Sequence, residues 1–445
     1  MSELPSGWGR AEIGDLCNLI NGRAFKPQEW SESGLPIIRI QNLNNPASKF
    51  NHFSGEFDAK HHVKNGDLLF AWSGTPGTSF GAHIWHGGDA VLNQHIFKIE
   101  FSERETNRGF LRYAINQKLD ELISSAQGGV GLRHVTKGTF EKTEISFPPL
   151  AEQTRIAQKL DELLAQVDTL KARIDGIPTL LKRFRQSVLT SAVSGRLTEG
   201  WRDERQLPSI CEVELGALIK SGPQNGLYKP SSAYGEGSKI IRIDSFYSGE
   251  IKAWDTLRSL KLEPKELDAW GVKTGDILIN RVNSIEYLGK CALVRTVPEP
   301  TVFESNIMRM SLHTDRIHPE YLMRYLTSEV GRKALIVKAK HAVNQASINQ
   351  GDVKACKVPL PSLEEQTEIV RRVEQFFAFA DQLETKVTSA KNRIDHLTQS
   401  ILAKAFRGEL VPQYPNDEPA SVLLERIKAQ RTAAPKAKRG RKASA

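Results

Sequence analysis

A nine-residue pattern, Pro-x-Leu-x-Glu-Gln-Thr-x-Ile, occurs twice in this chain, beginning at Pro148 and again at Pro361. Behind each copy, apolar residues recur at alternating steps of four and three, from Ile156 to Val188 and from Ile369 to Ile401. This spacing is the a/d seam of a coiled coil. The chain is therefore constrained to contain two long helices of one design, each preceded by a segment of domain size.

The two apolar seams keep the same phase along their whole length. The first comprises Ile156, Leu160, Leu163, Val167, Leu170, Ile174, Ile177, Leu181, Phe184 and Val188, and the second comprises Ile369, Val373, Phe376, Ala380, Leu383, Val387, Ala390, Ile394, Leu397 and Ile401. Gly195 and Gly408 are suited to cap the helix C-termini. Pro178 interrupts only the first seam, so we expect that helix to kink or open near Ile177 and the second to run straight.

The segments in front of the helices also match each other. "IIRI" at 37–40 recurs at 240–243, and "GDLLF" from Gly66 is answered by "GDILI" from Gly275. Short apolar runs bounded by Gly, Asn and Pro indicate strands, and helical stretches are expected near 110–122 and 321–337. We predict a mixed α/β fold with an internal repeat: globules at 1–149 and 198–361, long helices at 150–197 and 362–410, and a C-terminal segment at 411–445.

The net charge of +9 is concentrated at the C-terminus. Eight Lys or Arg and no acidic residue lie between Arg426 and Ala445, which leaves +1 for the rest of the chain. A stretch rich in Ala, Lys and Arg buries too little apolar surface to fold alone, so we expect a disordered basic tail. Such a tail would add salt-sensitive attraction to phosphates.

Other features of the composition exclude several classes of protein. No apolar run is long enough to span a bilayer, and "MSELPSGWGR" lacks the regions of a signal peptide, so a cytoplasmic location without membrane contact is expected. The four cysteines, Cys17, Cys211, Cys291 and Cys356, form no Cys-x-x-Cys pair, and we expect them to be reduced and mostly buried. The paired histidines at 61–62 and at 83 and 86 lack further ligands, so no metal site is predicted.

This order of parts resembles the DNA-specificity subunit of Type I restriction-modification enzymes. "AFRGELVPQYPNDEPASVLLERIKAQR", residues 405–431, is similar to the C-terminal end of one branch of that family. The resemblance implies that each globule is a target recognition domain for one half of a split, asymmetric site in double-stranded DNA. It also implies that the helices pack as an antiparallel coiled coil, which acts as the spacer between the two domains.

The resemblance further implies partners that perform the chemistry. These are two modification subunits that use S-adenosylmethionine as methyl donor, and ATP-dependent restriction subunits with helicase and nuclease activity. The chain itself has neither the Asn/Asp-Pro-Pro-Tyr/Phe motif of an adenine methyltransferase nor a Gly-x-x-x-x-Gly-Lys-Ser/Thr loop. We therefore expect a subunit without catalytic residues or a cofactor of its own. The outer helix faces and the segment 423–427 are the apolar surfaces we expect the modification subunits to cover.

Candidate DNA contacts follow from comparing the two globules, because domains that read different half-sites should share their scaffold and differ at base contacts. Arg39 and Arg242, inside the shared "IIRI", suit structural pairing or phosphate contact. Long polar side chains in unmatched loops suit base edges. The candidates are Arg23, Lys26, Gln41, Asn42, Arg133 and His134 in the first globule, and Gln224, Asn225, Tyr228, Arg281, Asn283, Asn344 and Gln345 in the second.

Three alternatives stay open at this point. Any single candidate contact can instead be an ordinary solvated loop residue. The same heptads suit a scaffold that joins two interaction globules without binding nucleic acid. An enzyme whose active site is assembled from scattered residues is the third reading.

Overall fold

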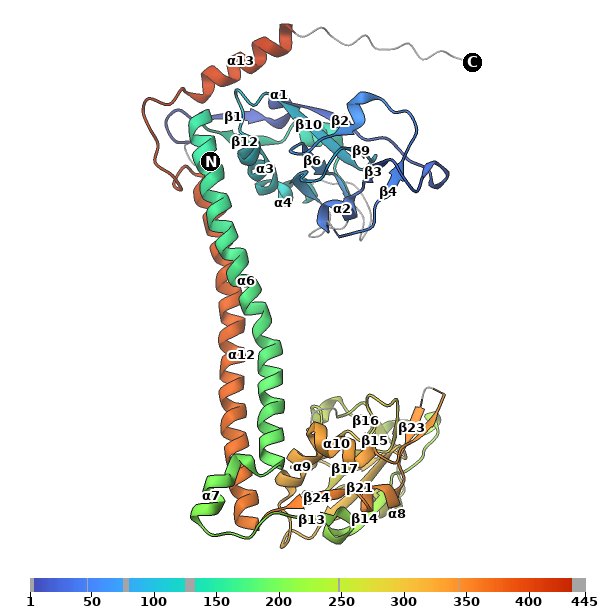
Figure 1. Ribbon diagram of the computed structural model, residues 1–445. Coiled ribbons are helices and arrows are strands. Elements are labelled where there is room, and N and C mark those ends of the chain that lie inside the picture. Colours follow the sequence, from blue (N-terminus) through green and yellow to red (C-terminus); the bar gives the residue numbers. More distant parts are fainter. Residues whose placement is uncertain are drawn as a thin grey trace. The chain divides into compact units, whose positions relative to one another are not determined.

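The computed structural model describes residues 4–45, 47–74, 80–124, 133–246, 249–343 and 345–433. The chain divides into two compact units (Figure 1). Unit 1 comprises residues 1–173 and 391–445, and unit 2 comprises residues 174–390. The helices α6 (Leu150–Val193) and α12 (Leu363–Phe406) each contribute one half to each unit.

The described part of unit 1 contains two four-stranded sheets. The first has the order β2 (Cys17–Asn21), β10 (Ile96–Phe101), β6 (Leu68–Ala71) and β8 (Gly81–Ile84), antiparallel throughout. The second has the order β4 (Asn51–Phe53), β3 (Leu35–Ile38), β9 (Ala90–Leu92) and β5 (His62–Val63), with β3 and β9 parallel. All four residues of β6 are buried, as in a strand covered on both faces.

Shorter elements complete unit 1. Two further strand pairs are β1 (Gly9–Glu12) with β12 (Glu144–Phe147), and β7 (Ser73–Gly74) with β11 (Arg133–His134). The helices are α1 (Ile13–Leu16), α2 (Ile40–Asn44), α3 (Arg108–Gln117), α4 (Leu119–Ser124) and α5 (Lys137–Glu141). The helical stretch expected near 110–122 is thus two short helices, α3 and α4.

Unit 2 repeats this plan. Its four-stranded sheet has the order β14 (Ile219–Asn225), β21 (Ile307–Leu312), β17 (Ile277–Asn280) and β19 (Cys291–Leu293). A second sheet has the order β16 (Arg258–Leu260), β15 (Tyr234–Ile241) and β20 (Thr301–Phe303), with β15 and β20 parallel. β13 (Cys211–Glu214) pairs with β24 (Lys357–Leu360), and β18 (Val282–Asn283) joins β23 (Gln345–Ser347) and β22 (Lys340–Ala342).

The helices of unit 2 are α7 (Glu199–Glu204), α8 (Pro264–Trp270), α9 (Pro319–Thr327), α10 (Glu329–Ile336) and α11 (Gln350–Lys354). "GDLLF" and "GDILI" lie on the corresponding strands β6 and β17, and the two copies of "IIRI" lie at the ends of β3 and β15. The internal repeat predicted from the sequence is therefore confirmed.

The repeated Glu-Gln-Thr motif anchors each long helix to its globule. Gln153 is fully buried; its Nε2 donates to the carbonyl oxygens of Pro148 (2.9 Å) and Glu105 (3.4 Å), and its Oε1 accepts from the Asn107 N–H (2.8 Å). Gln366 makes the same three bonds, to Pro361 O (2.9 Å), Arg316 O (3.2 Å) and His318 N–H (2.7 Å). The motif occurs twice because each helix needs the same buried attachment.

The acidic residue of the motif holds a neighbouring segment. Trp8 Nε1 donates to Glu152 at 3.0 Å, and burial raises the pKa of that carboxyl above its usual range although the Trp8 bond opposes the shift. In unit 2, Glu365 is fully buried and accepts from Thr198 Oγ1 (2.6 Å) and Arg202 Nη1 (2.7 Å). Both glutamates thus tie the helix start to the N-terminal segment of the globule in front of it.

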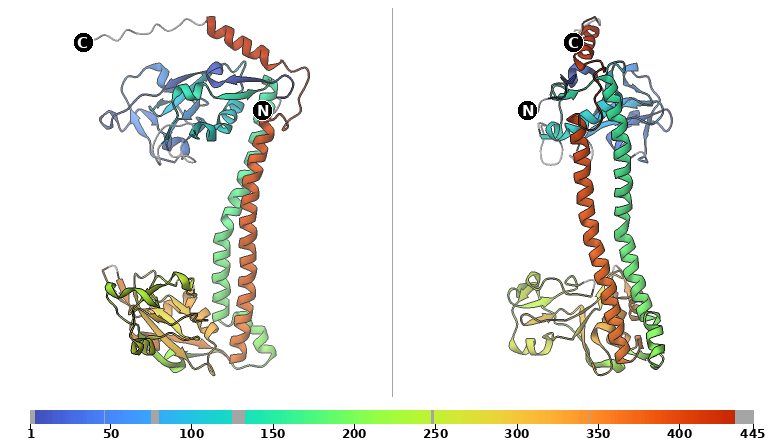
Figure 2. Two further views of the ribbon diagram at one scale, coloured as in Figure 1. Left: turned by 180° about the vertical axis from the view of Figure 1, so that it is seen from behind. Right: turned by 90° about the vertical axis from the view of Figure 1, so that its left-hand side faces the viewer.

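The two long helices lie side by side and antiparallel within each unit (Figure 2). Lys171 of α6 pairs with Asp395 of α12 in unit 1, and Arg185 of α6 pairs with Asp381 in unit 2. Partner numbers fall in α12 as they rise in α6, which is the antiparallel direction. The seam residues are buried or half-buried except Leu170, Phe376 and Leu397, which are 40–47% exposed. The predicted coiled coil is confirmed.

The structure also shows how α6 and α12 end and how α6 accommodates Pro178. Gly195 and Gly408 both have φ near +75°, the left-handed conformation that suits glycine after a helix C-terminus. α6 runs through Pro178 without a break, so the helix does not open at that residue. Whether the α6 axis bends there stays a prediction.

The C-terminal segment differs from the expectation. α13 (Ala420–Ala433) is a helix that packs on β1 and α1, and Ala420, Leu423 and Ile427 are buried against unit 1 (Figure 1). The apolar stripe at 423–427 therefore faces this chain itself, and the expectation that it awaits a partner is wrong. The basic stretch from Arg426 is helical as far as residue 433, contrary to the expected disorder, while residues 434–445 lie outside the described residues.

The structure also bears on the predictions about membrane-spanning segments and cysteines. Within the described ranges, no helix is both long enough and apolar enough to cross a membrane. The four cysteines are free; three are buried and Cys211 is exposed, as predicted.

Candidate nucleic-acid interface

In unit 1, one of the predicted contacts, Gln41, lies at a hollow together with Arg39 and aromatic residues from other segments. A pocket of about 300 Å³ is lined by Phe25, Trp30, Arg39, Ile40, Gln41, Asn93 and His95. Gln41 is exposed, and its Oε1 accepts from Arg39 Nη2 at 2.8 Å. Arg39 also lies over the Trp30 ring, 5.7 Å from its centroid. The hollow thus presents amide, guanidinium and aromatic groups together.

Trp72 connects this hollow to β11. Its ring lies 5.4 Å from that of His95 and 5.8 Å from that of His134. Trp72 Nε1, His95 Nδ1 and His134 Nδ1 are buried and have no hydrogen-bond partner in the described part of the protein. Burial lowers the pKa of His95, with a smaller contribution from the charge of His134. We call the six residues Trp30, Arg39, Gln41, Trp72, His95 and His134 strip 1.

The remaining unit 1 candidates are placed differently. Arg23 forms an ion pair with Glu29 and lies over the rings of Phe25 and Phe53, so its charge is already balanced. Lys26 is exposed beside it. Asn42 is buried, with its amide bonded to the Arg39 N–H and to the Ser48 carbonyl, which shapes the loop. The backbone of Arg133 pairs with Gly74, while its side chain lies outside the described atoms.

Unit 2 has a hollow at the corresponding place. A pocket of about 360 Å³ is lined by Leu227, Tyr228, Lys229, Ser231, Tyr234, Arg242, Arg258, Glu304, Ser305 and Asn306. Tyr228 is 78% exposed, the second largest exposure among the exposed large apolar or aromatic side chains that the structure describes. Arg242 pairs with Glu304 at 3.2 Å, as expected for a structural arginine.

Arg281 occupies the place that Trp72 has in unit 1. The backbone N–H of Trp72 donates to the His95 carbonyl oxygen (3.3 Å), and the backbone N–H of Arg281 donates to the Asn306 carbonyl oxygen (2.9 Å). Beyond Arg281, Asn283 and Gln345 lie on the neighbouring strands β18 and β23. We call Tyr228, Tyr234, Arg242, Arg258, Arg281, Asn283 and Gln345 strip 2. Asn344 lies outside the described residues.

Gln224 and Asn225 lie beside strip 2 on β14 and have structural partners. Gln224 Nε2 donates to Ala269 O at 3.1 Å, and Arg309 donates to its Oε1. The carbonyl oxygen of Asn225 accepts from Trp270 Nε1 at 3.1 Å, while its side chain is exposed.

Sequence comparison missed Trp30, Trp72, His95, Tyr234 and Arg258. Its criterion was a long polar side chain in an unmatched loop, and four of these residues are aromatic rings or histidine. Trp72 directly follows the buried run of β6, and Arg281 follows β17 in the same way. The residue immediately after each repeated buried strand was the signal in the sequence that could have found this position.

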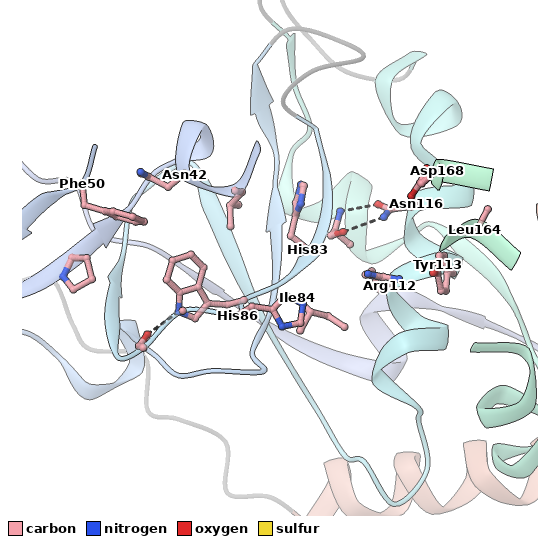
Figure 3. Close-up of a pocket in the computed structure, with 16 residues that line it drawn as sticks. Asn42, Phe50, His83, Ile84, His86, Arg112, Tyr113, Asn116, Leu164 and Asp168 are labelled. Carbon is pink, nitrogen blue, oxygen red and sulfur yellow. Dashed lines mark hydrogen bonds between the residues drawn. The ribbon is translucent and has the colours of Figure 1, made fainter. Parts of the chain in front are cut away.

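A larger cavity of about 730 Å³ lies between β8, α3 and α6 of unit 1 (Figure 3). Asn116 of α3 reaches across to β8, where its Nδ2 donates to Ala82 O (3.0 Å) and its Oδ1 accepts from Ala82 N–H (2.7 Å). Of the residues predicted from the sequence, only Asn42 lines it. This cavity is therefore separate from strip 1.

Two globules that carry equivalent strips with different side chains define a protein with two related recognition domains on one scaffold. A family model described as the Type I restriction modification DNA specificity domain matches residues 5–179 and 199–390. The chain belongs to this family of specificity subunits.

Relatives and solved structures agree with this assignment. The Type I restriction enzyme EcoKI specificity subunit of Escherichia coli strain K12 is 36% identical over 466 residues, 99% of both chains. The EcoBI specificity subunit of Escherichia coli is 36% identical over 467 residues, 99% of this chain and 95% of that one.

Two solved structures share the fold. The HsdS subunit from Thermoanaerobacter tengcongensis matches with a TM-score of 0.59 at 19% identity, over 92% of this chain and 99% of that one. A chain from a structure of the assembly and conformational transition of the type I R-M system matches with a TM-score of 0.65 at 18% identity, over 92% and 100%.

Proposed function

We propose that this chain is the sequence-specific DNA-binding subunit of a Type I restriction-modification complex. It recognises an asymmetric bipartite site in double-stranded DNA and directs two methyltransferase subunits and the restriction subunits to that site. The observation that carries the proposal is the recurrence of one backbone position in both globules with different side chains, Trp72 in the first and Arg281 in the second. A shared scaffold with different side chains is what reading two unlike half-sites requires.

Within each strip, the residues divide by role. Gln41 and Asn283 carry amides suited to adenine, and Arg258 and Arg281 carry guanidinium groups suited to guanine. Arg39 and Arg242 recur at the same position in both globules, so we assign them to phosphate contact or structural pairing. Lys26 and Tyr228 are exposed beside the hollows and complete the contact surface. Asn42 and Gln224 instead hold the surrounding loops through the bonds described above.

Base contact is tested by Gln41→Ala and Tyr228→Ala in the reconstituted complex. Each variant should weaken binding by about 1–3 kcal/mol, and only for targets that keep the block read by the mutated globule. Gln117→Ala is the matched control, because Gln117 is an exposed glutamine at the end of α3, away from strip 1. An equal loss on specific and unrelated DNA would contradict base contact and indicate a phosphate contact.

A methyl-transfer assay tests whether catalysis belongs to the modification subunits. The chain alone should transfer no methyl group from S-adenosylmethionine to DNA, and adding two copies of a modification subunit should restore methylation at a defined site. Scintillation counting of labelled DNA is the measurement. Methylation by the isolated, homogeneous chain would contradict the proposal.

A further inference from the structure

Unit 2 contains a cationic cavity that lies outside strip 2. Its volume is about 490 Å³, and it lies among α6, α9, α12 and the loop that leads into β19. Five cationic side chains line it, with one carboxylate: Lys182, Arg185, Lys290, Arg324, Arg332 and Glu384. None of these residues belongs to strip 2.

The nearby carboxylates balance only part of this charge. Arg185 is paired with Asp381 (2.6 Å) and Glu384 (2.8 Å), and Arg324 lies 3.9 Å from both Glu320 and Glu374. Arg332 instead directs its guanidinium to the carbonyl oxygens of Ile285 and Glu286 (2.7 Å each) and Leu288 (3.2 Å). Neutral carbonyls satisfy its donors and leave its charge in the cavity.

Two buried donors in the cavity wall have no acceptor. Gln186 Nε2 and Arg324 Nε are shielded from solvent and make no hydrogen bond with any described residue. Burial lowers the pKa of Lys290, and the positive charge of Arg332 lowers it further. The positive potential of the cavity lining favours a bound anion.

The floor of the cavity is apolar. Cys291 and Leu326 are 2% and 1% exposed, and Leu189 is 8% exposed. A concave site of a few hundred Å³ with an apolar floor and a few convergent polar groups is typical for small organic ligands. A nucleic-acid backbone is usually followed by an open groove.

The equivalent cavity of unit 1 provides an internal comparison (Figure 3). It lies between β8, α3 and α6, the counterparts of β19, α9 and α12 in unit 2. Its arginine, Arg112, is paired with Asp161 at 3.1 Å, and Asp168 adds a second carboxylate. Arg324 in unit 2 likewise faces Glu374 at 3.9 Å, so the two cavities share this arginine, and the second adds Lys182, Arg185, Lys290 and Arg332.

We propose that the unit 2 cavity binds a small organic phosphate, such as a nucleoside diphosphate, at a site separate from DNA recognition. The phosphates would lie among the cationic groups of Lys182, Lys290 and Arg332. The organic group would cover Leu189 and Leu326. The bound molecule would join α6 to the globule of unit 2 through these contacts.

Calorimetric titration of the full chain with ADP, and separately with inorganic phosphate, tests the proposal. ADP should bind, inorganic phosphate should compete with it, and Lys182→Gln should weaken ADP binding about tenfold. Lys290→Gln should have a similar effect. Arg183→Gln is the matched control: this exposed neighbour on α6 lies outside the cavity lining, and ADP affinity should change less than about twofold.

Three results would overturn the proposal. One is the absence of ADP and phosphate binding at millimolar concentration. Another is a hexaglutamate peptide that binds this site more tightly than ADP, which would assign it to an acidic protein segment. The third is a Lys182→Gln variant that loses affinity for a DNA duplex and keeps its affinity for ADP, which would place the cavity on the DNA path. DNA recognition through the strips is measured independently of all three.

Discussion

Gln153 and Gln366 occupy the same position of the repeated motif, and each holds its long helix to the globule in front of it. Each amide oxygen accepts from a backbone N–H far away in sequence, because Asn107 and His318 lie 46 and 48 residues earlier. A buried amide needs all its bonds satisfied, and only the folded chain shows which backbone groups satisfy it.

Replacing either glutamine should detach its helix start. Gln153→Ala removes three buried hydrogen bonds and leaves backbone groups unpaired, which should cost about 3 kcal/mol of local stability. The Asn107 amide, which donates to Gln153, should lose protection in hydrogen exchange, and the His318 amide should respond in the same way to Gln366→Ala. Gln158→Ala on the exposed face of α6 is the control. Unchanged protection of Asn107 in Gln153→Ala would contradict this role.

Glu368 should give α12 an acid-sensitive contribution. Hydrogen bonds from Arg371, and next from Arg372, lower the pKa of this carboxyl to about 2. Because the folded pKa lies below the unfolded value of about 4.3, the stabilisation is fully present above pH 4.3 and is lost as the pH falls through 2. Glu368→Gln should cost about 1 kcal/mol or less at pH 7.

The Glu368 prediction is checked by thermal unfolding at a series of pH values. The difference between Glu368→Gln and the natural chain should shrink steadily between pH 4.3 and pH 2. Glu374→Gln is a useful comparison, because its carboxylate reaches Arg324 only at 3.9 Å. A stability difference that stayed constant down to pH 2 would contradict stabilisation by the hydrogen bonds from Arg371 and Arg372 to Glu368.

Among the helices, the apolar a/d period and the capping glycines predicted the two long ones well. The short helices were predicted poorly. The a/d seam located α6 and α12, and the φ values at Gly195 and Gly408 match the predicted caps. α13 was mistaken for partner surface and tail, because three apolar residues at steps of three and four look alike whether they face this chain or another. Arg431 donates to Cys17 O (2.8 Å), a contact more than 400 residues away in sequence.

The middle of α6 should be the weak point of the helix pair. Pro178 lacks an amide hydrogen, and Gly176 is exposed with open space around it. Pro178→Ala should stabilise the local helix by about 3 kcal/mol and Gly176→Ala by about 1 kcal/mol. Hydrogen exchange of residues 174–182 is the measurement. Ser389→Ala, at the matched position of α12, should gain only about 0.5 kcal/mol; equal gains in both helices would contradict a weak point in α6.

For the chain as a whole, the internal repeat was predictable because both globules keep the residues that build one common fold. The residues of the two strips were predicted only in part, because their side chains differ between the two copies. Trp72 and Arg281 occupy equivalent backbone positions in the two globules, but their side chains are chemically different. No periodicity or cap marks such a position, so the sequence predicted some of the loops that form the strips and missed several of their side chains.

Exchange of one globule should alter one half of the target. Replacing residues 10–145 by another recognition domain should change one sequence block and leave the other block and the gap unchanged, because each strip lies within one unit. Methylation-site sequencing of the reconstituted complex is the measurement. A simultaneous change in both blocks would show that the globules do not read DNA independently.

The gap between the blocks should depend on the length of the helices. From Ile156 to Val188 the seam spans about 48 Å at 1.5 Å per residue. Half-sites on one face of B-DNA are about 34–36 Å apart for one helical turn, so we predict two unlike blocks whose centres lie about one turn apart across an unread gap. A continuous or palindromic target would contradict this geometry.

Deleting one heptad from both helices tests it directly. Residues 164–170 and 396–402 face each other in the antiparallel register that the Lys171 and Asp395 pair defines, so their joint removal keeps both seams in phase. The deletion shortens each helix by about 10 Å, or about three base pairs of DNA. Three base pairs also turn the second block by about 100° around the DNA axis, so binding should weaken. Methylation-site sequencing should nevertheless show both blocks unchanged and the preferred gap about three base pairs shorter, whereas an unchanged gap would show that the helices do not set the spacing.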